Sequence, residues 1–216
     1  PSGLGVNTRL LGWGVGFFDM DNDGWLDILM SNGHVYPEVD KSNADLKYAE
    51  HKYLYRNLRN GRFEEVTAKG GPGIMERVPA RGCAFGDYDN DGDIDIAVNC
   101  VNAIPQLLRC DSTLHRNWIK LKLIGTHCNR TAIGARARVI TGKHIQTDEV
   151  HSGTSVMSQN DLRLHFGLGT AAVVDAIEIR WPTTLKIERF TRVSANQILT
   201  IREGQGIVGT MKPRGA

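Results

Sequence analysis

The sequence predicts an all-β protein in two parts, a partial β-propeller followed by a small domain that resembles a β-sandwich. Residues 14–33 align with residues 82–101, and in each copy apolar residues alternate on both sides of a short acidic loop. Alternation with a period of two is the pattern of a half-buried strand. From about Trp118 the repeat gives way to seven short alternating runs without a helical stripe, which is the pattern of a compact sandwich.

Each copy of the repeat is expected to form a unit of about four strands, as a propeller blade does. In the first unit, the polar stretch 34–52 resembles an insertion loop. Residues 53–67 then predict two strands joined by a turn at 59–61. In the second unit, residues 105–111 are the counterpart of the first of these two strands. The glycines of the run 12–18 are expected to allow close packing between strands.

The second part is predicted to be a separate β domain. We assign residues 1–117 to the two blades, 118–203 to the β domain and the Gly-rich residues 204–216 to a flexible tail. Gly, Asn, Pro and Thr separate the alternating runs, as expected for turns between short strands. The expected strands of this domain lie at 118–124, 133–140, 144–151, 162–168, 174–181, 186–190 and 198–203.

Both acidic loops fit the pattern D-x-D-x-D-G-x-x-D, which suits a calcium ion. Two unit charges about 4 Å apart repel by on the order of 4 kcal/mol at an effective dielectric of 20, so four gathered carboxylates favour a cation. Calcium takes about six to eight oxygen ligands, which here are carboxylates and the backbone carbonyl at position 7. The expected ligands are Asp19, Asp21, Asp23, the Trp25 carbonyl and Asp27 in one loop, and Asp87, Asp89, Asp91, the Asp93 carbonyl and Asp95 in the other.

Other interpretations of these loops fit less well. An EF-hand needs flanking helices and a Glu at the twelfth position, where the loops have Met30 and Val98. Magnesium is less favoured because cages made of many protein carboxylates suit it poorly. A solvated acidic turn without an ion is the remaining alternative, and the second copy in register counts against it. Asn22 and Asn90, at position 4, are expected to brace the turns.

The quoted residues carry a resemblance to known families. The runs FFDMDNDGWLDILMSNG and AFGDYDNDGDIDIAVN resemble the FG-GAP (VCBS-type) repeats of integrin-like β-propellers, and the stretch from WIKLKL at 118 to ANQILTIREG at 195–204 resembles the ASPIC/UnbV domain. This pairing is the architecture of cartilage acidic protein and its bacterial relatives. It implies calcium-stabilised blades and an extracellular or cell-surface location. A full propeller of this kind has about seven blades, so the resemblance also implies further N-terminal blades of the same protein.

Composition and charge narrow the function classes. The chain is 41% hydrophobic and 23% charged, which is ordinary for a globular protein, and no run is long enough to span a membrane. Residues 1–96 carry a net charge of −6 and residues 97–216 a net charge of +8. The basic residues of the second half alternate with apolar ones, so we expect them on the wet faces of strands rather than at a nucleic-acid site.

The four cysteines lack C-x-x-C spacing, which argues against a structural zinc site. A Cys100–Cys110 disulfide, a Cys110–Cys128 disulfide and unpaired thiols all remain open. Asn129 begins a glycosylation sequon, which has meaning only in a secreted eukaryotic protein.

These observations predict a non-enzymatic, calcium-binding interaction or adhesion module that is secreted, extracellular or at the cell surface, with the periplasm also compatible. The expected partner is an extracellular protein or glycan, and no nucleic acid is expected. The alternative is an accessory enzyme or maturation factor with an active site around His151, Asp161 and His165. A third interpretation makes the second domain a purely structural cap on the propeller.

Overall fold

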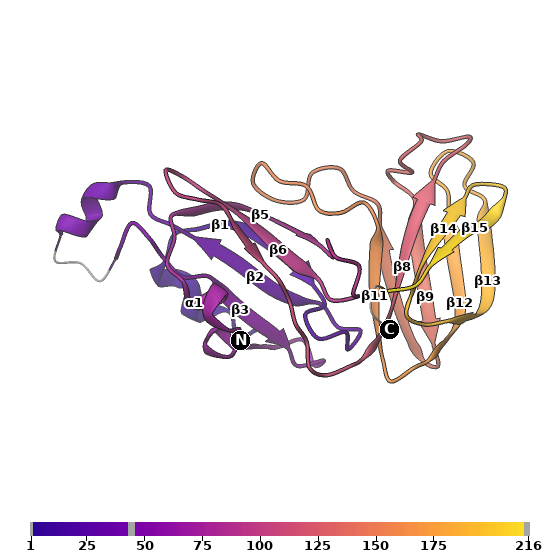
Figure 1. Cartoon of the computed structure of the whole chain (residues 1–216), viewed down its shortest axis with the longest axis horizontal. Coiled ribbons are helices and arrows are strands. Elements are labelled where there is room, and N and C mark those ends of the chain that lie inside the picture. The colour runs from indigo at the N-terminus through magenta and orange to yellow at the C-terminus, as the bar shows by residue number, and fades with distance from the viewer. Residues whose placement is uncertain (1, 43–45, 214–216) are drawn as a thin grey trace.

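The computed structural model describes residues 2–42 and 46–213 and contains two β domains side by side (Figure 1). The first domain holds two sheets, and the linker 109–116 leads from it into the second domain, which holds two more. Helical structure is confined to short turns. These are η1 (Gly5–Arg9), η2 (Pro37–Lys41), η3 (Thr67–Lys69) and α1 (Pro72–Met75).

The first blade is a four-stranded antiparallel sheet in the order β1-β2-β3-β4, as predicted. The turn between β3 and β4 contains Arg59 and Gly61 with φ of 60° and 77°, which matches the turn expected there. Of the expected insertion loop 34–52, residues 43–45 lie outside the described residues. The strands are β1 (Gly12–Phe18), β2 (Asp27–Asn32), β3 (Tyr53–Asn57) and β4 (Phe63–Glu65).

The second blade has three strands rather than the expected four in the described part of the chain. They are β5 (Ala80–Gly86), β6 (Asp95–Cys100) and β7 (Gln106–Leu108), in that order. After β7 the backbone of the linker donates hydrogen bonds to the second acidic loop, from Cys110 N to Asp95 and from Ser112 N to Asp93, each at 2.9 Å. The linker therefore follows the loop instead of turning back as a fourth strand.

The two blades share one core and pack through β1 and β5. The rings of Phe18 and Phe85, which precede the two acidic loops, lie 5.0 Å apart. A Cβ atom at Gly14 would lie 2.7 Å from Arg81 O and from Cys83 N. Only glycine permits this approach of β1 to β5, which confirms the close packing expected of these glycines.

The second domain is a sandwich of two four-stranded sheets, as the sequence predicts. One sheet has the order β10-β9-β12-β13 and the other β11-β8-β14-β15, in which β14 runs parallel to β8. The strands are β8 (Asn117–Ile124), β9 (Arg136–Thr141), β10 (His144–Glu149), β11 (Leu164–Gly169), β12 (Val173–Arg180), β13 (Ile187–Ser194), β14 (Gln197–Arg202) and β15 (Gly206–Met211).

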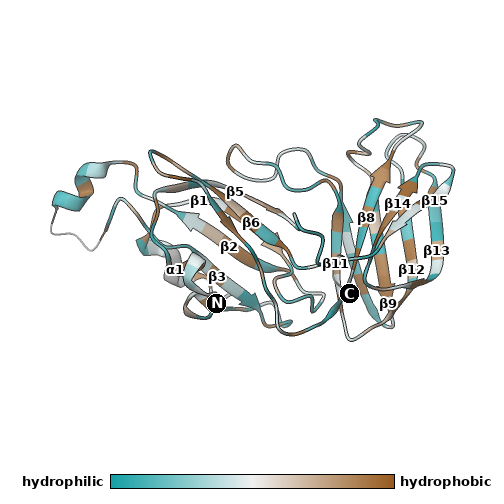
Figure 2. Ribbon diagram, viewed as in Figure 1, coloured by the Kyte–Doolittle hydropathy of each residue, from teal (hydrophilic) through white to brown (hydrophobic). Residues whose placement is uncertain are grey.

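Alternating side chains of the two sheets form the core of the sandwich. On β8, Ile119, Leu121 and Leu123 point inward and are buried, while Lys120 and Lys122 lie on the outer face. The resulting bands of apolar and polar residues along the strands are visible in Figure 2. The outer face of β8 therefore carries two lysines, and the contacts of that face determine how the two domains meet.

The prediction that residues 204–216 form a flexible tail is wrong for residues 206–211. Residues 206–211 form β15, which pairs with β14 at the edge of its sheet. Gly204 and Gly206 have φ of 75° and 74° and allow a tight turn, and Ile207 and Val208 then supply β propensity. The glycines of this segment therefore allow the turn of a hairpin and do not indicate disorder.

Glu203, which follows β14, anchors the loop 125–131. Its Oε2 accepts hydrogen bonds from the backbone N–H groups of Thr126, His127 and Cys128 at 2.8 to 3.1 Å. Burial raises the pKa of this carboxyl, but the three donors lower it more, and the resulting pKa is about 2. All four cysteines lie in the described part of the chain and are unpaired, so neither disulfide that the sequence allows is present.

We predict that Glu203→Gln lowers the free energy of unfolding of the second domain by about 2 kcal/mol at neutral pH, because it removes an ionised acceptor of three hydrogen bonds. The pKa of Glu203 is depressed in the folded state, so its contribution is complete above its ordinary pKa near 4.5 and is lost as the pH falls toward 2. Urea titrations from pH 6 down to the acid limit, taken as about pH 2, measure the difference between wild type and variant.

The exposed Asp111, which pairs with Arg109, offers the control Asp111→Asn, which should be close to neutral. A wild-type advantage over Glu203→Gln that stays constant down to the acid limit would contradict this account of Glu203.

Candidate metal centre

The two acidic loops occupy equivalent positions at the end of each blade that faces the second domain. Asp19 directly follows β1 and Asp27 begins β2, while Asp87 follows β5 and Asp95 begins β6. The hairpin registers pair Phe18 with Asp27 and Gly86 with Asp95. Each loop thus closes a hairpin whose strands are fixed by the blade core.

In the first loop, the carboxylates of Asp19 and Asp27 are held by backbone donors. Asp19 accepts from the N–H groups of Asp23 and Gly24 at 3.0 and 2.7 Å, and Asp27 accepts from those of Met20 and Asn57 at 3.1 and 2.8 Å. Carboxylate oxygens of Asp19, Asp21 and Asp27 all lie within 4.8 Å of one another, and all three residues are buried. Three of the four expected carboxylates therefore converge.

Arginines form ion pairs with the other two carboxylates of the first loop, those of Asp21 and Asp23. Asp21 lies between Arg56, at 2.9 Å, and Arg116, whose Nη1 is 2.7 Å from Asp21 Oδ1 in a contact that is an ion pair but has no hydrogen-bond geometry. Asp23 forms an ion pair with Arg59 and is not part of the converging group. Four carboxylates are thus opposed by three guanidinium groups.

In the second loop, Asp87, Asp89 and Asp91 bring carboxylate oxygens within 4.8 Å of one another. Asp87 accepts from the N–H groups of Asp91 and Gly92, and Asp89 receives only a long bond of 3.4 Å from Asp91 N. Asp95 instead accepts from backbone donors at Tyr88 and Cys110. The two loops match in sequence, but different members of each converge.

Lys120 supplies the ion pair of the second loop and corrects one expectation from the sequence. Its alternation with apolar residues predicts a solvent-facing side chain, yet it is 1% exposed and its Nζ donates to Asp87 Oδ2. The prediction is correct for Lys122, which is two residues further on the same face and exposed. The second loop gathers five aspartates against this one lysine, so it carries more uncompensated negative charge than the first.

Asn22 and Asn90, the fourth residues of the two loop motifs, shape the turns and also contact the second domain. Asn22 and Asn90 have left-handed φ of 55° and 62°. The Oδ1 of Asn22 accepts from His165 Nε2 at 2.7 Å, and that of Asn90 accepts from Arg163 Nη1 at 2.5 Å. The side chain of Asn22 also donates to Asp93 of the other acidic loop at 2.9 Å. Both loops therefore contact the second domain, beside β11 in Figure 1.

Desolvation makes the converging carboxylates electrostatically unfavourable without a cation. Burial raises the pKa of Asp19 and of Asp27 to about 7 against the lowering effect of their backbone donors, and neighbouring aspartates raise it further. In the second loop, burial raises the pKa of Asp91 in the converging group, and it raises the pKa of the neighbouring Asp93 and Asp95 to about 6. Hard oxygen donors that are close together, buried and short of compensating charge fit a hard divalent cation.

The carbonyl roles expected of Trp25 and Asp93 stay predictions. The ring of Trp25 lies 5.0 Å from that of His144 on β10, and His144 Nε2 is 2.9 Å from Gly24 O. The Asp93 carboxylate accepts from Ser112 N and from Asn22. These distant partners lie 19 to 120 residues away in the sequence, and no local pattern points to them.

Comparisons with protein families find one match in each of the two domains. Residues 44–98, which include the second acidic loop, match the FG-GAP-like repeat, and residues 125–208 match the family described as ASPIC and UnbV. The chain combines an FG-GAP-like repeat with an ASPIC/UnbV domain. No curated protein matches it at significant similarity. The first acidic loop lies outside the matched range and is assigned as a second repeat by its alignment with the matched one.

The residues of the alternative, enzymatic interpretation lie in the ASPIC/UnbV domain beside the domain junction. His151, Asp161 and His165 line a cavity of about 490 Å³ there. Asp161 is bound to Arg163 at 2.6 Å, and burial lowers the pKa of His165, whose Nε2 is bound to Asn22. Asp161 thus binds an arginine that contacts Asn90 across the junction, and His165 contacts Asn22 directly.

We predict that Lys120→Met lowers the free energy of unfolding by about 3–5 kcal/mol, because it leaves Asp87 charged, buried and without its cation. Lys122→Met is the matched control, since it makes the same change on the same strand face at an exposed residue and should change stability by about 0.5 kcal/mol or less. Thermal and urea unfolding of both variants in calcium-free buffer measure the effect. Equal stabilities of the two variants would show that the ion pair does not hold the junction.

Proposed function

We propose that this chain is a calcium-binding, non-catalytic interaction module in which calcium in the acidic loops stabilises the contact between the FG-GAP-like blades and the ASPIC/UnbV domain. One observation carries the proposal. The same two loops that gather carboxylates also bind the ASPIC/UnbV domain through Asn22, Asp87 and Asn90. A cation bound there would act on the fold of a blade and on the domain junction together.

The donor sets define where calcium would bind. Asp19, Asp21 and Asp27 would hold one ion, and Asp87, Asp89 and Asp91 the other. Bound calcium would supply positive charge to carboxylates that are costly to keep ionised in the interior, and it would fix the turn between the two strands of each hairpin. The second loop should bind more tightly, because three arginines already neutralise the first.

An extracellular location would suit the calcium proposal. FG-GAP-like repeats are typical of extracellular proteins. In the ranges 2–42 and 46–213, no helix is long and apolar enough to cross a membrane. Calcium sites of extracellular modules need only modest affinity, on the order of 10⁻⁴ to 10⁻³ M. We place the chain outside the cell or at its surface, where the rigid pair of domains would present a surface to a protein or glycan.

Calcium titration tests the proposal. Calorimetry on chelator-treated protein should give two sites with dissociation constants on the order of 10⁻⁴ to 10⁻³ M. Calcium at ten times such a constant should raise the free energy of unfolding by about 1.4 kcal/mol per site. Asp89→Asn should abolish the tighter site and Asp21→Asn the weaker one, because each removes a converging carboxylate.

Asp111→Asn serves again as the control, since this aspartate lies outside both converging groups and is exposed. Absence of calcium uptake by the folded protein, together with a thermal midpoint that chelation leaves unchanged, would refute the proposal.

A further inference from the structure

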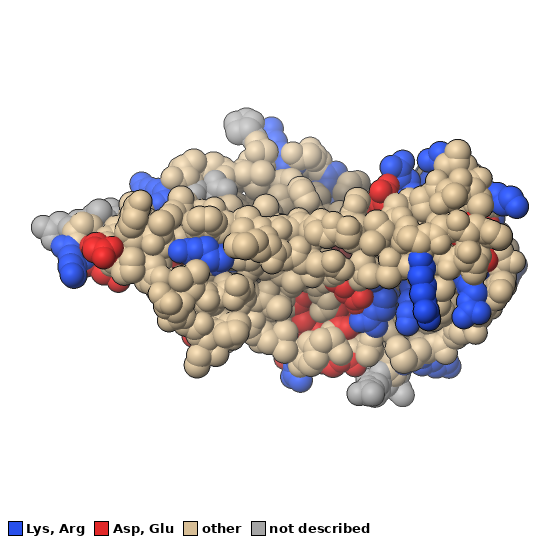
Figure 3. Space-filling view, turned by 90° about the horizontal axis from the view of Figure 1, so that it is seen from above, with Lys and Arg blue, Asp and Glu red and all other residues tan. Residues whose placement is uncertain are grey.

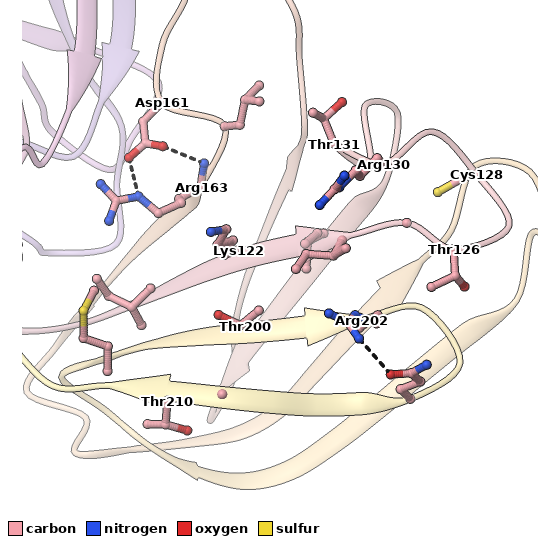
Figure 4. Close-up of a pocket in the computed structure, with 18 residues that line it drawn as sticks. Lys122, Thr126, Cys128, Arg130, Thr131, Asp161, Arg163, Thr200, Arg202 and Thr210 are labelled. Carbon is pink, nitrogen blue, oxygen red and sulfur yellow. Dashed lines mark hydrogen bonds and ion pairs between the residues drawn. The ribbon is translucent and has the colours of Figure 1, made fainter.

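An open basic cleft lies on the outer face of the sheet β11-β8-β14-β15. Its lining includes Arg163, which contacts Asn90 of the second acidic loop. The volume of the cleft is about 1170 Å³. Lys122 of β8 and Thr200 and Arg202 of β14 form its floor, and the loop 125–131, which carries Arg130, forms one wall (Figure 4). Glu203 holds this loop through three backbone hydrogen bonds. The wall is thus a fixed part of the domain.

The cleft carries positive charge that the protein does not neutralise. Within the described ranges, Lys122, Arg130 and Arg202 form no ion pair. Asp161 is the carboxylate that lines the cleft, and it is bound to Arg163 at 2.6 Å. Figure 3 shows the basic side chains gathered over the part of the molecule formed by the second domain.

The opposite sheet of the sandwich pairs three of its outer arginines with carboxylates, although Arg180 on the same face forms no ion pair among the described residues. On the outer face of β10-β9-β12-β13, Arg136 pairs with Glu149 at 3.0 Å, and Glu178 pairs with two arginines. Both outer faces carry basic residues, but the face of β10-β9-β12-β13 also carries the carboxylates that pair with three of them. The other leaves its cations free for an anion that comes from outside.

The spacing of the floor residues suits an extended ligand with repeated charges and hydroxyl groups. Lys122 is directly opposite Thr200 on the neighbouring strand, and Arg202 follows two residues later. Strand geometry places Lys122 and Arg202 about 8 Å apart at the backbone, with Thr200 next to Lys122 and on the same strand as Arg202. Thr126, Thr131 and Thr210 add further hydroxyls around the cleft.

We propose that this cleft binds an acidic polysaccharide, with Lys122, Arg130 and Arg202 contacting its sulfate or carboxylate groups. The inference rests on the proposed function as an interaction module and names its partner class. The cations supply the charge complementarity, and the threonines can donate to and accept from sugar hydroxyls. None of the described residues that line the cleft is aromatic, so single-stranded nucleic acid would find no ring on which to stack its bases.

An acidic peptide fits the cleft less well. Peptides that bind to sheets usually add a strand to a free edge, where main-chain hydrogen bonds give affinity. The floor here is the face of β8 and β14, whose backbone groups already pair with each other and with β11 and β15. Side-chain contacts alone remain, and these favour a ligand that is rich in hydroxyl and anionic groups.

Binding of fluorescently labelled dextran sulfate, with uncharged dextran as the matched polymer, tests the inference. The wild-type protein should bind the sulfated polymer and not the neutral one. The triple variant Lys122→Thr, Arg130→Thr, Arg202→Thr should lose roughly tenfold or more in affinity, because three exposed ion pairs are removed. The control Lys143→Thr, Arg180→Thr, Lys186→Thr makes the same charge change at exposed residues outside the cleft and should bind as the wild type does.

Each result separates the inference from its alternatives. Equal losses in the two triple variants would show binding by net charge alone and overturn the assignment to the cleft. Equal or tighter binding of polyglutamate or double-stranded DNA would overturn the assignment to a polysaccharide. Calcium uptake, measured on the same samples, reports on the acidic loops. Protein that takes up calcium but does not bind dextran sulfate therefore refutes this inference and leaves the proposed calcium function standing.

Discussion

Compensation of buried negative charge is the constraint on which the arrangement of the two domains depends. Two hairpins place nine aspartates where the blades meet the ASPIC/UnbV domain. Their charge is offset by residues from elsewhere in the chain, among them Arg116 of the linker and Lys120 of β8. Because each offsetting group must reach a fixed carboxylate, the need to neutralise the loops also fixes where the second domain sits.

Local patterns in the sequence predicted most of the strands but not the contacts between them. They missed β15, and they predicted a fourth strand of the second blade that the described residues do not form. Alternation and the repeated acidic motif gave the strands and both loops, because these signals lie within about ten residues. The partners of the loops in the second domain lie much further along the chain, at 33 residues for Asp87 with Lys120 and 143 residues for Asn22 with His165. Alternation assigns Lys120 to the outer face correctly, but it cannot tell whether that face meets water or another domain.

The internal repeat is preserved in its turns and has diverged in its contacts. Asn22 and Asn90 have the same left-handed backbone and each accepts a hydrogen bond from the region around β11, yet one partner is a histidine and the other an arginine. Three arginines form ion pairs with carboxylates of the first loop, whereas one lysine does so in the second. Equivalent motifs in one chain thus differ in the charge left for a metal ion, which a motif alone does not reveal.

The burial of the Lys120–Asp87 pair has a consequence for how the molecule responds to ionic strength. Mobile counterions screen exposed charges over about 8 Å at physiological salt, and buried pairs are screened much less. The junction of the two domains, with its lysine 1% exposed, is therefore insulated from changes in electrolyte. The exposed cations on the outer face of β8 and β14 are not, so salt weakens contacts made on that surface while the scaffold that carries it stays intact.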